Sequence, residues 1–351
     1  MSDVFSHPWL GGLFGDPEMA ELWSAETQLA HYTAFKVALA HALETAGRVP
    51  PGHGAGAAAS LAAHAIDPVS LAGDVARDGL PIPALVRRWR AADTDHADAI
   101  HTGATSQDVM DTALALTLRA VSDLLLRRLG ALDRALGDLM DRFGDRPLMG
   151  RTRMQAALPI TVADRLRDWR APLAAQAGRL DAARADVERL QLGGAVGTRH
   201  GFGADGQVIA DAMAERLGLA SPDHAWHSDR GGVAHYAACL SGLSGTLGKM
   251  GQDIALMAQQ GLDEIRIAGG GGSSAMPHKS NPVLAELLVT LARLNAGHLA
   301  GVQNALIHEQ ERSGAAWMLE WALMPQMALA TGRSVTAAQV LCDRIEDIGN
   351  A

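Results

Sequence analysis

The stretch Leu240-Ser-Gly-Leu-Ser-Gly-Thr-Leu-Gly-Lys-Met-Gly-Gln-Asp-Ile-Ala-Leu-Met257 decides the fold class of this 351-residue chain. Its apolar side chains recur at alternating steps of three and four residues, at Leu240, Leu243, Leu247, Met250, Ile254 and Met257. This spacing puts them in one line along a helix, as in the seam of a coiled coil. The pattern therefore predicts a long helix that packs lengthwise against other helices.

Two further segments show the same spacing. One carries Leu118, Val121, Leu125, Leu132, Leu136 and Leu139, and the other follows Asn281 and carries Leu284, Leu288, Leu291, His298 and Val302. Aromatic residues are only 4% of the chain and period-two alternation is nearly absent, which is typical of a helical protein. We expect an all-α fold, with a small N-terminal helical domain at 1–108 and a central long-helix bundle at 109–351. Rods of this length also favour oligomerisation.

The bulk composition limits the possible partners. A formal net charge of −9 argues against binding to nucleic acid or to an acidic membrane surface. No uncharged apolar run approaches the ~18 residues of a membrane span, and the N-terminus does not resemble a signal peptide. Cys239 and Cys342 fit no disulfide or metal pattern, so we expect reduced thiols and a cytoplasmic protein. A few arginines and lysines could still form a pocket for a small anion.

The segment Gly269 to Asn281 gathers polar groups behind a run of glycines. The four consecutive glycines cannot lie inside a helix, because each costs about 1 kcal/mol there relative to alanine. Hydroxyl, ammonium and amide groups follow at Ser273, Ser274, Lys279, Ser280 and Asn281. Such a loop could close over an anionic substrate held at the start of the next helix. The alternative is a flexible linker that ends in a helix cap.

Three other segments place polar residues or glycines at the ends of predicted helices. In His101–Asp108, hydroxyls at the start of a helix could bind a carboxylate, and His101 could transfer a proton. The alternative is that the segment only caps the helix. In Gln191–Thr198, glycines would let the backbone approach a ligand, or form a simple turn. In Trp226–Arg230, a histidine and an arginine could hold an anion, or lie on a surface helix start.

The segment His308–Arg312 begins like a zinc-binding HExxH motif. That motif needs a second histidine three residues after the glutamate, and Arg312 occupies the position. We therefore expect neither a metal nor a cofactor.

Together these segments resemble the fumarase/aspartase superfamily, which includes adenylosuccinate lyase and argininosuccinate lyase. The resemblance rests on Gly272-Ser-Ser-Ala-Met-Pro-His-Lys-Ser-Asn-Pro282 and on its order after the motifs at 101–106 and 194–198. Within the superfamily the sequence is most similar to the 3-carboxy-cis,cis-muconate cycloisomerases, through Leu13–Met19, Trp226–Arg230 and His308–Trp321. The resemblance implies a three-part helical fold, a small polycarboxylate substrate and a homotetramer whose active sites are shared between subunits.

Two departures from the superfamily pattern matter. Its members usually continue into a small C-terminal helical domain, so that domain is expected to be missing or reduced in a chain that stops at Ala351. In the connector Arg151-Thr-Arg-Met-Gln155, Arg153 stands where the lyases carry a histidine that assists the leaving group. This favours ring closure by the substrate's own carboxylate, which needs no such histidine. The alternatives are a fumarate-releasing lyase of the adenylosuccinate or argininosuccinate type and, without catalysis, an inert helical scaffold.

The resemblance also implies roles for individual residues. Ser273 would transfer the proton at Cα, with its anion stabilised by loop amides and Lys279. Lys279 and Asn281 would hold the carboxylate that gains charge, and His101 would orient the substrate or donate the proton instead. A tricarboxylate needs several such partners. The remaining candidates for substrate contact are Thr105, Ser106, Gln107, Arg151, Arg153, Gln155, His227 and Arg230.

Overall fold

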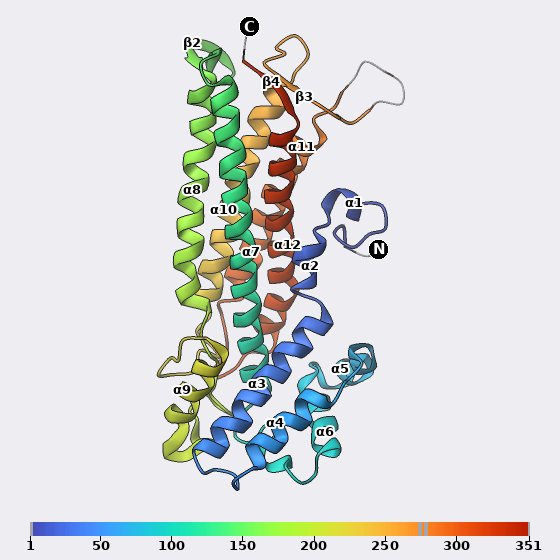
Figure 1. The fold of residues 1–351 in the computed structure, drawn as a ribbon, viewed down its shortest axis with the longest axis vertical. Helices are drawn as coiled ribbons and strands as arrows, with labels where there is room; N and C mark the ends of the chain where they lie inside the picture. The colour runs from blue at the N-terminus through green and yellow to red at the C-terminus, as the bar shows by residue number, and fades with distance from the viewer. Residues whose placement is uncertain (1–2, 273–275, 277–279, 350–351) are drawn as a thin grey trace.

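The computed structural model, which describes residues 3–272, 276 and 280–349, shows an elongated molecule built around long helices (Figure 1). The helices that run along its long axis are α7 (Ser106–Phe143), α8 (Val162–Val187), α10 (Gly231–Met257), α11 (Val283–Asn304) and α12 (Ala315–Asp343). Helix α10 lies at the centre, because it packs against α8, α11 and α12. The all-α class and the long bundle are confirmed.

The predicted seams form the core of this bundle. All six seam residues of α7, and all six of α10, are at most 2% exposed. In α11, Leu288, Leu291 and Val302 are buried, whereas Leu284 and His298 are half-buried. The 3-4 spacing therefore identified which face of each helix meets its neighbours.

A smaller helical body lies at one end of the bundle (Figure 1). It holds α3 (Ala25–Thr45), α4 (His53–Ala63), α5 (Ala72–Asp78), α6 (Ile82–Ala92) and α9 (Gly206–Leu217), with 3₁₀ turns η1 (Pro68–Leu71), η2 (Ala97–Ala99) and η3 (His200–Asp205). Short α1 (Gly11–Phe14) and α2 (Pro17–Glu21) lie beside the bundle instead.

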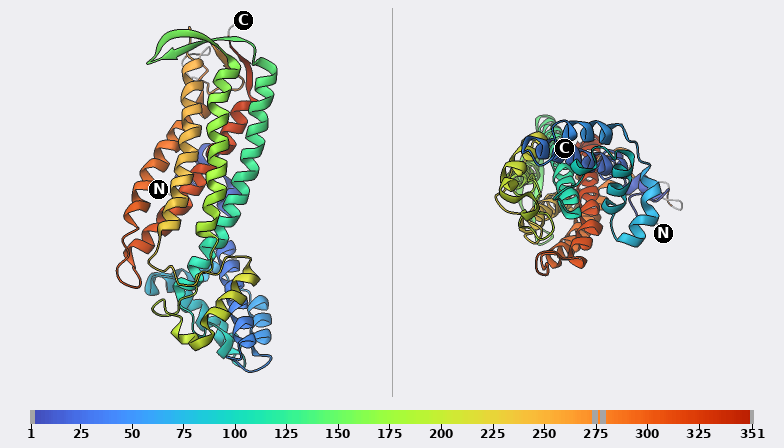
Figure 2. Two further views of the ribbon diagram at one scale, coloured as in Figure 1. Left: turned by 90° about the vertical axis from the view of Figure 1, so that its left-hand side faces the viewer. Right: turned by 90° about the horizontal axis from the view of Figure 1, so that it is seen from below.

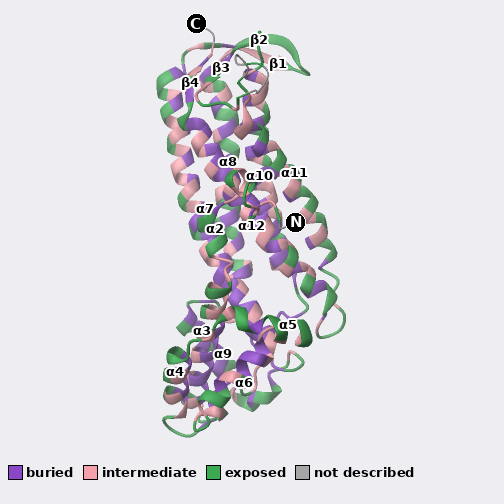
Figure 3. Cartoon of the chain, turned by 90° about the vertical axis from the view of Figure 1, so that its right-hand side faces the viewer, coloured by how far each residue is buried: buried purple, intermediate pink, exposed green. Residues whose placement is uncertain are grey.

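Two hydrophobic cores divide the chain. The core of the smaller body includes α9, which follows the bundle helices α7 and α8 in sequence, while Met19 of α2 belongs to the bundle core. Figure 3 shows buried residues both along the bundle and inside the smaller body. The domain boundary at 108 stays a prediction, and the packing adds that the chain crosses between the two bodies more than once.

Two antiparallel strand pairs lie at the opposite end of the bundle (Figures 1 and 2). Strands β1 (Pro147–Thr152) and β2 (Gln155–Thr161) form a hairpin between α7 and α8. Strand β3 (Ile265–Ile267) pairs with β4 (Ile345–Ile348), which follows α12. The second pair anchors the beginning of the glycine-rich segment to the end of α12, since Ala268 N also donates to Arg344 O at 2.8 Å.

Candidate active site

The predicted site residues fall into two groups at opposite ends of the bundle. The first group, here called the junction cluster, comprises residues 101–108, 191–198, 226–230 and 308–312, which meet where the bundle joins the smaller body (Figure 1). The second, the loop-end cluster, comprises residues 151–155, 268–272 and 280–282. Helix α7 alone, with 38 residues, separates the two by roughly 57 Å at 1.5 Å per residue.

Asp108 is the residue that holds the junction cluster together. Its fully buried carboxylate accepts hydrogen bonds from the backbone N–H of Thr105 at 2.9 Å, of Gly193 at 2.8 Å and of Gly194 at 2.9 Å. It also lies 2.8 Å from Nε2 of His227. Three of the predicted segments are therefore joined through one carboxylate that motif reasoning did not select. Its signal was its place at N3 of the helix, where an acidic side chain caps the start.

Arg230 lies at the centre of a buried ion-pair network. Its guanidinium donates to Asp111 at 2.8 and 3.1 Å and to Glu320 at 2.9 and 2.5 Å, and it is 2% exposed. It also stacks over the ring of Trp226. Two carboxylates of the chain therefore already neutralise the charge of Arg230, and its contact with a substrate stays a prediction.

Gln107 also faces the interior. It is fully buried, and its Nε2 donates to Asp111 at 3.1 Å and to the backbone oxygen of His227 at 2.9 Å. Its amide nitrogen therefore already has two partners within the chain, and its contact with a substrate carboxylate stays a prediction. Thr105 and Ser106, at the start of α7, are only half-buried. They are the members of that predicted trio that remain available to a ligand.

His101 occupies an unusual conformation beside a buried lysine. Its φ is 68°, in the left-handed region that non-glycine residues seldom adopt, and its Nδ1 contacts Nζ of Lys36. Burial, together with the positive charges of Lys36 and Arg90, lowers the pKa of His101 to about 2. At neutral pH the ring is uncharged, so it can donate or accept a hydrogen bond but does not carry a cation to the substrate.

The turn at Gly194 is packed from two sides. A Cβ added at Gly194, whose φ is 67°, would lie 2.8 Å from the backbone oxygen of Gly103, so the turn closely approaches the His101 loop. Arg312 donates to the backbone oxygens of Ala195 at 2.9 Å and Gly194 at 3.3 Å. The loop between α11 and α12 therefore belongs to the junction cluster, with a guanidinium at its edge.

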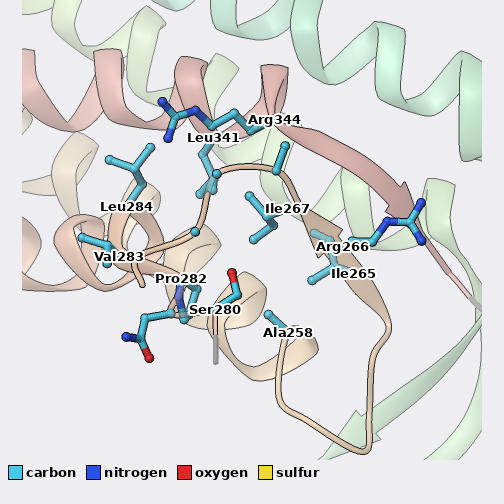
Figure 4. Close-up of a pocket in the computed structure, with 15 residues that line it drawn as sticks. Ala258, Ile265, Arg266, Ile267, Ser280, Pro282, Val283, Leu284, Leu341 and Arg344 are labelled. Atoms are coloured by element: carbon cyan, nitrogen blue, oxygen red, sulfur yellow. The ribbon is translucent and has the colours of Figure 1, made fainter. Parts of the chain in front are cut away.

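At the other end, the glycine-rich segment is closed at its base. Gly271 and Asn281 exchange two backbone hydrogen bonds of 2.9 Å, which form a neck. A cavity of about 360 Å³ lies beside the neck, lined by Ser280, Asn281 and Arg344 among others (Figure 4). Ser273 and Lys279, the predicted proton-transfer and anion-binding residues, lie outside the described residues.

The predicted connector residues form the tip of the β1–β2 hairpin. Arg151 pairs with Glu264 at 2.6 Å, while Arg153 and Gln155 are exposed. Arg153 and Met154 both have positive φ, of 50° and 66°, and form the turn itself. Arg151 and Arg153 line a second cavity, of about 330 Å³. One chain therefore brings neither arginine to the junction cluster.

A family model and several known proteins are similar to this chain. Residues 84–296 match the family model described as Lyase. The chain is 36% identical over 99% of its length to 3-carboxy-cis,cis-muconate cycloisomerase of Pseudomonas aeruginosa, covering 77% of that protein.

Two solved structures share the fold. The 3-carboxy-cis,cis-muconate lactonizing enzyme of Pseudomonas putida has a TM-score of 0.90 and 33% identity, over 97% of this chain and 77% of that one. A fumarate lyase of Mesorhizobium sp. BNC1 has a TM-score of 0.89 and 31% identity, over 96% and 76%. The chain therefore belongs to the lyase family with the fumarase/aspartase fold, the family that includes the 3-carboxy-cis,cis-muconate cycloisomerases.

Proposed function

We propose that the protein is a cycloisomerase that closes 3-carboxy-cis,cis-muconate to 4-carboxymuconolactone, a step of protocatechuate (beta-ketoadipate) degradation. The relatives named above support this reaction, and one observation carries it. The hairpin tip presents Arg153 and Met154, and no imidazole, where a fumarate-releasing lyase would need an acid for its leaving group.

The chemistry needs little acid–base assistance. A substrate carboxylate oxygen adds to the conjugated carbon, and the π electrons move to Cα, where the adjacent carboxylate stabilises them. Cα then takes a proton, and no group leaves. Tethering the nucleophile to the substrate supplies much of the advantage of orientation. The protein therefore has to bind three carboxylates and deliver one proton.

The predicted site residues divide that task into two halves. In the junction cluster, the half-buried hydroxyls of Thr105 and Ser106 at the start of α7 would hold one carboxylate, aided by the helix N-terminus. His101 would donate a hydrogen bond as a neutral ring. From the loop end, Asn281 and Lys279 would hold the carboxylate that gains charge, and Ser273 would deliver the proton.

The two halves can meet only across subunits, so we propose a homotetramer with shared sites. Helix α11 supports an interface: by length and composition it is apolar enough to cross a membrane, yet only 28% of its most apolar window is buried within one chain. Glu286 and Arg293 lie within this helix, and we assign its apolar face to contacts with other copies in a soluble, cytoplasmic protein.

A fumarate-releasing lyase is the second candidate, favoured by the likeness to the solved fumarate lyase. Both readings are tested by incubating the protein with enzymatically prepared 3-carboxymuconate, following loss of diene absorbance, and with adenylosuccinate, following fumarate. Loss of the diene alone supports the cycloisomerase. Fumarate without loss of the diene overturns it, and inactivity in both assays favours an inert scaffold.

A further inference from the structure

Lys36 is a fully buried lysine that no sequence motif singles out. It lies on α3, is 0% exposed, and contacts Nδ1 of His101 through its Nζ. Within the described part of the chain it makes no ion pair with a carboxylate. Burial of an ammonium without a counter-ion is costly, so such a lysine marks a place where a bound ligand could supply the missing charge.

Two other charged groups face this pair. Arg90 on α6 donates to the backbone oxygen of Ile100 at 3.0 and 2.7 Å, and so supports the residue that precedes His101. Asp108 on α7 adds a negative charge that favours the ammonium of Lys36. Its carboxylate is already bound to amides of the junction cluster, however, and does not reach Lys36 as a direct partner.

The ring of His101 offers two edges with different surroundings. Nδ1 faces Lys36, while Nε2 has no hydrogen-bond partner among the described residues. The loop that carries the ring is tightly packed, because a Cβ on Gly103 would clash with Phe202. Which ring nitrogen holds the proton therefore depends on what Lys36 does at Nδ1.

We propose that Lys36 is a positioning residue that sets the tautomer of His101, and that substrate binding is coupled to uptake of one proton by this pair. As an ammonium, Lys36 donates to Nδ1, which leaves the ring proton on Nε2, where it can donate to a carboxylate held at Thr105 and Ser106. The charge of that carboxylate in turn stabilises the ammonium. This inference depends on the proposed function in one respect only, namely that the ligand of the site carries a carboxylate.

The pH dependence follows from the surroundings of Lys36. Burial, with Arg90, lowers the pKa of Lys36 well below its usual value, although Asp108 opposes the shift. A bound carboxylate raises this pKa again. Binding therefore takes up a proton at any pH between the pKa of the free enzyme and that of the complex, and affinity falls as pH rises through this interval and levels off above it.

The test is titration calorimetry of the intact oligomer with tricarballylate, a stable tricarboxylate, in phosphate and in Tris at the same neutral pH. The difference between the two heats gives the number of protons taken up. We expect proton uptake of at most one per site by the wild type and none by Lys36→Met, which should bind roughly tenfold more weakly or worse. Lys249→Met, which removes an exposed ion pair with Asp253, is the matched control and should behave as wild type.

Four outcomes are informative. Equal proton uptake by the wild type and Lys36→Met overturns the proposal, as does an active wild type that takes up no proton. Proton uptake without turnover of 3-carboxymuconate overturns the proposed function and leaves this inference standing. If tricarballylate does not bind, the pH profile of kcat/KM decides: the alkaline limb must differ between wild type and Lys36→Met. Unfolding of Lys36→Met should occur at or above the wild-type Tm, because the substitution replaces a fully buried amine with an apolar side chain of similar length.

Discussion

Asp108 shows how one buried side chain can organise residues that are far apart in sequence. Its carboxylate accepts from the start of α7 and from the glycine turn, and it lies beside His227. The candidate motifs at 101–106 and 194–198 could be recognised from sequence, but the buried carboxylate that joins these segments could not. An aspartate at N3 of a helix is most often a local cap, and only the fold shows that it also holds a second segment.

Replacing Asp108 with asparagine should therefore loosen the whole junction cluster. The amide nitrogen of Asp108→Asn would face a backbone N–H of Gly193 or Gly194, so that at least one buried donor loses its acceptor. We expect a loss of about 2 kcal/mol or more in the free energy of unfolding, and a fall in activity. Urea unfolding at fixed protein concentration measures the loss of stability. Asp98→Asn, which removes an exposed contact with His53, should change stability by at most about 0.5 kcal/mol.

Glu320 gives a pH-dependent prediction at the same scale. Burial raises its pKa, but hydrogen bonds from Arg230, together with the imidazole of His308 at 3.6 Å, outweigh burial and hold the pKa below the ordinary 4.5. A carboxyl whose pKa is lowered on folding contributes stability above its unfolded pKa, and this contribution is lost as pH falls through the folded value.

At neutral pH, Glu320→Gln should cost about 3 kcal/mol, because it leaves Arg230 with one carboxylate partner in place of two. The difference between wild type and Glu320→Gln should shrink as pH falls below about 4.5. Urea unfolding across that range measures the difference. Glu346→Gln, which loses an exposed contact with Arg266, serves as control. A difference that stayed constant with pH would contradict the assigned ionisation of Glu320.

At the scale of elements, the buried face of a helix was predicted where apolar residues recur at 3-4 spacing among polar ones. It was missed where the helix is apolar on most sides. Helices α7 and α10 follow their 3-4 spacing. Helix α12 is apolar on most of its surface and, like α8, contains a proline, Pro325 in α12 and Pro172 in α8. A proline inside a pattern predicts a break, and the packing of neighbouring helices overrides it here. The hairpin at 147–161 also gave no signal, because Arg153 and Met154 occupy positive-φ positions that usually take Asn or Gly.

The neck of the glycine-rich segment is the element whose geometry the sequence explains best. A Cβ on Gly270 would clash with Oγ of Ser280, whereas a Cβ on Gly272 would meet nothing within 4 Å. We expect Gly270→Ala to open the Gly271–Asn281 pairing and to reduce kcat at least tenfold, by displacing Asn281. Gly272→Ala should reduce it much less. Steady-state kinetics of the two variants would separate the effect of the clash at Gly270 from that of a stiffer backbone alone. Equal losses of kcat in both variants would show that the Gly271–Asn281 pairing is not needed for activity.

At the scale of the whole molecule, the separation of the two clusters means that the proposed site requires more than one subunit. The bundle is rigid and long, so no rearrangement within one chain brings Asn281 to Thr105. The sequence could indicate that these residues act together through the family resemblance. It could not show their separation, which follows from the length and direction of α7 and its partners.

This separation predicts complementation between two inactive variants. Thr105→Val damages the junction cluster, and Asn281→Leu damages the loop end, so each homo-oligomer should be inactive. When the two proteins are mixed, dissociated in urea and reassembled, about a quarter of the sites should draw an intact half from each variant, because each half comes from a randomly chosen subunit. Activity should therefore return in the mixture and in neither variant treated alone. A mixture that reassembles into oligomers of the same size but stays inactive would show that one chain supplies both halves, and would contradict the shared site.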